Sequence, residues 1–138
     1  MPPEASTQTA AGAEAFARHF WAQSDYTIAT GDIAPLAALS GPTCIRCEIE
    51  LQVVKTTRMM GGRWEKTAVT ISDVQISEGH PPGPVDLIFI YSVGEMKVFD
   101  MNGVTIEMYP GSTGQRSRLS LVPNGQSWLV SDYGAVVT

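Results

Sequence analysis

The chain has 138 residues, which is enough for one domain built around a single hydrophobic core. Hydrophobic residues make up 43% of the sequence and charged residues 17%, a composition that excludes an intrinsically disordered chain. The net charge is −5 and the nine Lys and Arg residues are scattered, which excludes the clustered positive surface that a nucleic-acid partner requires. We therefore expect a single globular domain over residues 1–138.

The first segment with a clear pattern, residues 4–30, predicts a long helix. It is rich in alanine, and Ala13, Phe16 and Phe20 recur at the three-and-four spacing of a helix with one apolar side. Gly31 is expected to end this helix, because glycine adopts the left-handed conformation of a C-cap without strain. We expect residues 1–5 to be a flexible N-terminal segment and the helices to occupy residues 6–60.

Two further helices are expected before residue 60. Asp32 can cap a short helix that runs to Leu39, and Ser40-Gly41-Pro42 ends it. A third helix then runs over residues 43–60 and is closed by Gly61-Gly62. Its apolar side is marked by residues that recur at helical spacing: Ile45, Ile49, Val53 and Met60.

Residues 64–133 change to the two-residue period of β-strands. Apolar positions alternate up to residue 71 and continue in the opposite phase from residue 74, so we expect a bulge at Ser72-Asp73. Val85 to Val93 is nearly all apolar, as in a strand covered on both faces. Asn102-Gly103 and residues 123–126 are expected hairpin turns, and residues 110–115 an expected loop.

Helices followed by strands are typical of the α+β class. We expect three N-terminal helices packed on one face of a curved antiparallel sheet of about five or six strands.

The two cysteines, Cys44 and Cys47, lie at the start of the third helix. A structural zinc site needs four ligands, and His19 and His80 lie at no ligand spacing. A thioredoxin-type redox site needs a preceding strand, which is missing. Residues i and i+3 of a helical turn have Cα atoms about 5–6 Å apart, which suits a disulfide. A structural disulfide is the favoured interpretation, with two free thiols as the alternative, and it favours an extracytoplasmic location.

No residue is singled out as catalytic, and no metal or cofactor site is expected. Asp32 and Asp100 are expected to act as a helix cap and a turn residue, and Asp132 as a solvated strand residue. Large apolar side chains form a candidate pocket, although core filling is the simpler interpretation of them: Phe16, Phe20, Tyr91, Phe99, Met101 and Trp128.

Two segments, "YTIATGDIAPLAAL" (26–39) and "LVPNGQSWLVSDY" (121–133), resemble the nuclear-transport-factor-2-like superfamily, also called cystatin-like or ketosteroid-isomerase-like. The resemblance implies a cone-shaped sheet whose mouth holds a small apolar ligand, and an outer sheet face that often pairs two subunits. Isomerases of this superfamily carry a tyrosine on the first helix, where this chain has Ser24.

More narrowly, "GAEAFARHFW" and "PLAALSGPTCIRC" resemble an uncharacterised family of actinobacterial lipoproteins. This resemblance implies attachment to a membrane only through a lipid anchor that is absent from this chain. We therefore expect a non-enzymatic extracytoplasmic domain that binds a small apolar ligand or a protein partner. The alternatives are an isomerase or cyclase with a pocket inside the cone, and a homodimerising module whose sheet carries Val98 and Tyr109 on its outer face.

Overall fold

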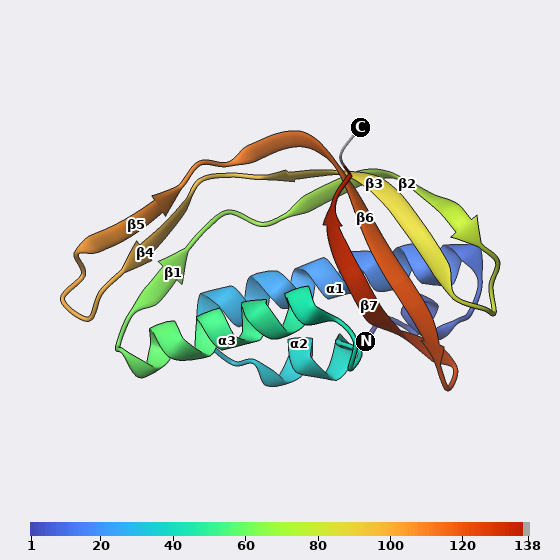
Figure 1. Cartoon of the computed structure of the whole chain (residues 1–138), viewed down its shortest axis with the longest axis horizontal. Helices are drawn as coiled ribbons and strands as arrows, with labels where there is room; N and C mark the ends of the chain where they lie inside the picture. The colour runs from blue at the N-terminus through green and yellow to red at the C-terminus, as the bar shows by residue number, and fades with distance from the viewer. Residues whose placement is uncertain (137–138) are drawn as a thin grey trace.

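Three α-helices precede seven strands in the computed structural model, which describes residues 1–136 (Figure 1). A short 3-10 helix, η1 (Pro3–Ser6), comes before the helices α1 (Ala10–Thr30), α2 (Ala34–Leu39) and α3 (Ile45–Met59). The strands are β1 (Arg63–Glu65), β2 (Thr70–Gly79), β3 (Val85–Val93), β4 (Met96–Phe99), β5 (Thr105–Tyr109), β6 (Ser112–Asn124) and β7 (Ser127–Ala135). The expected α+β class is confirmed.

The strands form two antiparallel sheets. The chain passes directly from a strand of the larger sheet into a strand of the smaller one, from β3 into β4, and returns from β5 into β6. The larger sheet has the order β2-β3-β6-β7 and the smaller one the order β1-β4-β5. Two residues separate β3 from β4, and two separate β5 from β6. The three-residue β1 is the strand that brings the expected five or six to seven. Figure 1 shows the smaller sheet continuing from the larger one and bending toward the end of α3.

The bend between the two sheets brings two backbones into close contact. A β-carbon placed on Gly111 would lie 2.6 Å from the carbonyl oxygen of Val93 and 2.8 Å from the carbonyl carbon of Gly94. Only glycine fits this approach without moving the backbone.

The hydrophobic core lies between α1 and the concave face of the larger sheet. The fully buried Phe16 and Phe20 of α1 belong to one cluster with Phe89 of β3 and Leu119 of β6. Leu36 and Leu39 extend this core under α2. The alternation of buried and less buried residues along β3 and β6 follows from the two-residue period of a strand that is covered mainly on one face.

The N-terminal segment differs from the expected flexible chain. Ala5 is fully buried, and its carbonyl oxygen accepts a hydrogen bond from the Ser127 hydroxyl at 3.1 Å. The indole Nε1 of Trp128 donates to the carbonyl oxygen of Thr7 at 3.0 Å. Helix α1 begins at Ala10 rather than at residue 4, because the Thr9 side chain caps it by accepting from the Gly12 amide at 3.0 Å.

Several local predictions are confirmed. Gly31 ends α1 with a left-handed φ of 79°. The register of β2 shifts between Ser72 and Gln75, where Asp73 has a φ of 53°. The segment 110–115 was wrongly expected to be a loop throughout, because β6 begins at Ser112 and pairs with the end of β3. Pairing with a long neighbouring strand outweighs the weak strand preference of a Gly- and Ser-rich segment.

Helix α3 packs through a side that the apolar pattern did not indicate. Cys47 and Val54 are buried, whereas Ile45, Ile49 and Val53 are exposed. The predicted apolar stripe therefore exists, but within residues 1–136 it faces away from the core.

Candidate functional site

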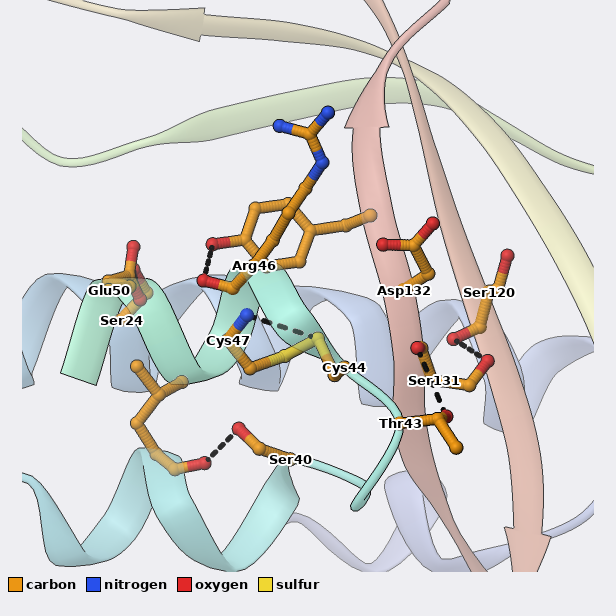
Figure 2. The surroundings of a disulfide bond; sticks show 12 residues. Ser24, Ser40, Thr43, Cys44, Arg46, Cys47, Glu50, Ser120, Ser131 and Asp132 are labelled. Atoms are coloured by element: carbon orange, nitrogen blue, oxygen red, sulfur yellow. Dashed lines mark hydrogen bonds between the residues drawn. A yellow bond between two sulfur atoms is a disulfide. The ribbon is translucent and has the colours of Figure 1, made fainter. Parts of the chain in front are cut away.

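The junction between α2 and α3 is held by the expected disulfide between Cys44 and Cys47 (Figure 2). Their Cα atoms lie 5.2 Å apart, and both side chains are buried. The Gly41 amide nearby donates to the carbonyl oxygen of Val130 at 2.7 Å, which ties the junction to β7. A cross-link over so short a loop removes on the order of 2 kcal/mol of unfolded-chain entropy. Its main effect is local, on the turn that begins α3.

A cavity of about 250 Å³ lies between α1, the first turns of α3 and the strands β3, β6 and β7. Its walls carry aromatic rings together with ionisable and amide groups. The lining residues are Trp21, Arg46, Glu50, Tyr91, Ser112, Gln115, Ser117, Arg118, Tyr133, Gly134 and Ala135. We call this space the mouth cavity.

Glu50 is the acidic side chain that lines the mouth cavity. The Ser24 hydroxyl of α1 lies 3.2 Å and 3.1 Å from the two carboxylate oxygens and donates to them (Figure 2). Burial raises the pKa of Glu50 above its ordinary value, although the Ser24 hydrogen bond and the positive charge of Lys66 act in the opposite direction. The negative charge of Asp25 adds to the rise. A carboxyl group in this environment holds its proton to a higher pH than an exposed one.

Two tyrosines face the same space. Burial, with the negative charges of Glu50 and Asp25, raises the pKa of Tyr91 to about 12. Burial, and to a smaller extent the negative charge of Glu50, also raises the pKa of Tyr133. Both phenols therefore stay protonated and can donate hydrogen bonds. The Tyr133 hydroxyl lies 3.3 Å from the backbone carbonyl oxygen of Arg46, to which it donates.

Trp21 forms the aromatic wall of the mouth cavity. Its ring meets those of Tyr91 and Tyr133 edge-on, at centroid distances of 5.2 Å and 5.4 Å. The side chain is only 7% exposed, yet its indole Nε1 has no hydrogen-bond partner among residues 1–136. A buried N–H without a partner costs free energy, and the other buried side-chain donors without one in the described residues are Arg58 Nε and Trp64 Nε1.

We expect Glu50→Gln to make the folded protein more stable at neutral pH. In the folded state the carboxyl has a raised pKa, so stability falls as the pH rises from the ordinary value of 4.5 through the raised folded value. Glutamine carries no charge and removes this loss. Urea unfolding at a series of pH values from about 4 to 8 should show the gap between variant and parent opening with pH.

The control for this series is Glu78→Gln, at an exposed position on β2. Parallel pH profiles of Glu50→Gln and the parent protein would contradict the assignment of a desolvated carboxyl at position 50.

Four of the six candidate pocket residues lie in or against one core cluster rather than around a common pocket. Tyr91 lines the mouth cavity, whereas Phe16, Phe20 and Trp128 are fully buried in the core. Two others lie in the smaller sheet or next to it. Phe99 packs under the guanidinium of Arg63 with 4.3 Å between the Arg63 Cζ atom and the ring centroid, and Met101 is exposed in the β4–β5 turn.

The acidic residues considered from the sequence have local roles. Asp32 accepts from the Ala34 amide at 3.2 Å in the first turn of α2. Asp100 accepts from the amides of Asn102 and Val104 and shapes the β4–β5 turn. Asp132 forms an ion pair with Arg118 at 3.0 Å.

Glu50 was not predicted as a site residue, although its position in the sequence carries a signal. Glu50 lies three residues after Cys47 and four before Val54, the two residues that α3 buries. A carboxylate on the buried side of a helix was therefore visible in the spacing. It was overlooked because the exposed stripe was taken as the packing side.

Metal ligands do not cluster within residues 1–136. No group of three or more His, Cys, Asp or Glu residues in this range is placed to hold a metal ion. Within the same range, no helix combines the length and the apolarity that crossing a bilayer requires.

Comparison with solved structures shows the fold. The intermembrane space region of the chloroplast protein ARC6 is similar, with a TM-score of 0.63 and 11% identity over 94% of this chain and 97% of that one. Aln2 from a Streptomyces species has a TM-score of 0.52 and 14% identity over 86% of this chain and 85% of that one. A calcium/calmodulin-dependent protein kinase II association domain from Xanthomonas campestris, described as putative, has a TM-score of 0.42 and 12% identity, covering 88% and 85% of the two chains.

The likeness to the ARC6 region and to Aln2 shows the fold of the chain alone. No curated protein is significantly similar to the chain in sequence. A family model described as "Family of unknown function (DUF6318)" matches residues 1–133. The chain therefore belongs to this family of unknown function, DUF6318.

Proposed function

We propose that this domain is a non-enzymatic, extracytoplasmic binding domain that holds a small ligand in the mouth cavity. The observation that carries the proposal is a cavity of about 250 Å³ bordered by Trp21, whose buried indole N–H has no acceptor within residues 1–136. This volume is just below the range of about 300–1,000 Å³ of pockets for drug-sized ligands, so the ligand is small.

The walls of the mouth cavity define the chemistry of this ligand. The edges and faces of Trp21, Tyr91 and Tyr133 favour a ring or another flat apolar body. The indole N–H requires a hydrogen-bond acceptor, and the protonated phenol of Tyr91 can supply a second donor. The ligand is therefore more polar than the purely apolar one that the superfamily resemblance implied.

The buried disulfide supports the extracytoplasmic part of the proposal, because disulfides persist in oxidising compartments. Lipid anchoring of a longer precursor belongs to the same proposal. A precursor sequence with a lipid-accepting cysteine ahead of residue 1 would support it, and a cytoplasmic precursor would contradict it.

The test uses two compounds of the same shape that differ in one acceptor. Acetophenone carries a carbonyl oxygen beside its ring, whereas ethylbenzene does not. In NMR titrations to about 1 mM, we expect acetophenone to shift the Trp21 indole N–H signal and to bind more tightly than ethylbenzene. Trp21→Phe keeps a ring but removes the donor, and should weaken acetophenone binding by about tenfold while leaving ethylbenzene unchanged.

Trp64→Phe is the matched control, because Trp64 lies outside the mouth cavity. Failure of both compounds to perturb any signal of the lining residues would contradict a small-ligand site. Equal weakening of both by Trp21→Phe would contradict the role assigned to the indole N–H.

A second candidate function, proton transfer as in an isomerase or cyclase, is favoured by the raised pKa of Glu50. In that case the Glu50 carboxylate would take a proton from the methyl group next to the acetophenone carbonyl and return a deuteron in D₂O. NMR would show exchange of the methyl protons above the buffer rate, lost in Glu50→Gln. Exchange at the buffer rate would leave the non-enzymatic function as the one supported.

A further inference from the structure

Helix α3 carries an apolar stripe that the core does not cover. Ile45 is 69% exposed, Ile49 58% and Val53 42%, and Met60, just after the helix, is 70% exposed. These residues recur at steps of four and seven, so they lie along one side of the helix. In Figure 1, α3 lies in front of α1 and no ribbon passes in front of it.

One edge of the stripe carries a negative charge near the start of α3 and a positive charge two turns later. Glu48 and Lys55 are both exposed and are seven residues apart, two turns of the helix, so they lie on the same edge of the stripe. Neither makes an ion pair with another residue in the described part of the chain, residues 1–136. If a second α3 packs antiparallel against the first, the negative charge of each helix therefore lies opposite the positive charge of the other.

An antiparallel second copy satisfies both features at once. When two α3 helices pack antiparallel with the two-fold axis between residues 51 and 52, Glu48 of each copy lies opposite Lys55 of the other. Ile49 of each then lies at the level of residue 54 of the other, one residue from Val53, so the apolar residues of the two stripes meet near the centre. The interface is self-complementary, as a two-fold axis requires.

In this register the ends of the stripe also contact the other copy. Ile45 of the second copy lies opposite residues 57 and 58, beside an apolar groove of about 400 Å³. The groove is bordered by Val53, Thr57 and Met60 on the side of α3 and by the smaller sheet on the other side. The stripe and the groove therefore form one continuous surface.

We propose that a second copy of this chain docks on α3 and forms an antiparallel two-fold dimer through the stripe. The outer sheet face expected from the superfamily resemblance is a poorer candidate. Val98 is buried and Tyr109 stacks on Trp64, and both line the groove that faces α3. The 15-residue α3 spans about 22 Å, so the interface is small and the dissociation constant falls in the micromolar range.

The test is a charge exchange read by sedimentation velocity from about 1 to 500 µM protein. Glu48→Lys places lysine opposite Lys55, and Lys55→Glu places glutamate opposite Glu48, so each single change should raise the dimer dissociation constant about tenfold. The double variant Glu48→Lys/Lys55→Glu restores opposite charges and should return the constant to near the parent value. Ile49→Asp, at an exposed position, should abolish the dimer without changing the circular dichroism spectrum.

Glu78→Lys and Lys97→Glu make the same net-charge changes away from α3 and serve as controls. A parent protein that stays monomeric over this range overturns the proposal and leaves the stripe to a partner of different sequence. If the dimer dissociation constant does not change with the charge exchange, or changes equally with the controls, the contact lies on another face and the proposal is also overturned.

Discussion

Replacing Trp128 with alanine is expected to lower the free energy of unfolding by about 3–5 kcal/mol. Trp128 is the largest fully buried side chain, and it lies in β7 among the residues of the main core. Its removal leaves a cavity that the closely packed neighbours cannot fill. Urea unfolding followed by far-UV circular dichroism measures the change without relying on tryptophan fluorescence.

A gentler substitution separates packing from the link to the N-terminal segment. Trp128→Phe keeps most of the buried surface but removes the hydrogen bond to the Thr7 carbonyl oxygen. We expect a loss of about 1–2 kcal/mol and faster amide hydrogen exchange over residues 3–9. Unchanged exchange in this segment would contradict the conclusion that Trp128 holds it against the core.

Replacing Lys66 with methionine is expected to cost about 3 kcal/mol. The Lys66 ammonium pairs with the carboxylate of Asp25 on α1, and the two side chains are only 6% and 22% exposed. The second carboxylate oxygen accepts from the Val69 amide at 3.0 Å. The variant leaves the partly buried carboxylate of Asp25 without its counter-ion, so the lost free energy comes mainly from the unpaired charge.

The matched control for Lys66→Met is Glu14→Gln, which breaks the exposed ion pair to Arg18 on the same helix. That pair lies at i,i+4 and should contribute no more than about 0.5 kcal/mol. Equal effects of the two substitutions in urea unfolding would show that the Lys66 pair is solvated. Restoring stability with Asp25→Asn in the Lys66→Met background would support the account, because the amide needs no counter-ion.

The order of elements could be predicted because each boundary has a local chemical cause. Gly31 ends α1, the opposite phases around Asp73 mark the bulge in β2, and Asn102-Gly103 forms the β4–β5 turn. The strand character of residues 112–117 could not be predicted, since it comes from pairing with β3, which lies about 25 residues earlier in the chain.

The site was harder to predict than the fold, because it depends on which side of α3 meets the core. Ile45 and Ile49 form a convincing apolar side in the sequence, and the periodicity is real. Cys47 instead faces inward, and Glu50 lies on the same side one turn later. Periodicity alone gives the stripe but not what packs against the opposite side of α3, so the contact between Glu50 and Ser24 could not be predicted from the spacing.

The close approach of Gly111 to Val93 and Gly94 affects the distance between α3 and the smaller sheet, which forms the tip of the protein. The smaller sheet is joined to the larger one through these few residues, so the angle set there decides how far β5 stands from α3. A methyl group at position 111 would push the crossing strands apart and reorient the whole tip. The width of the apolar groove is therefore controlled from a point outside it, by a residue that has no side chain.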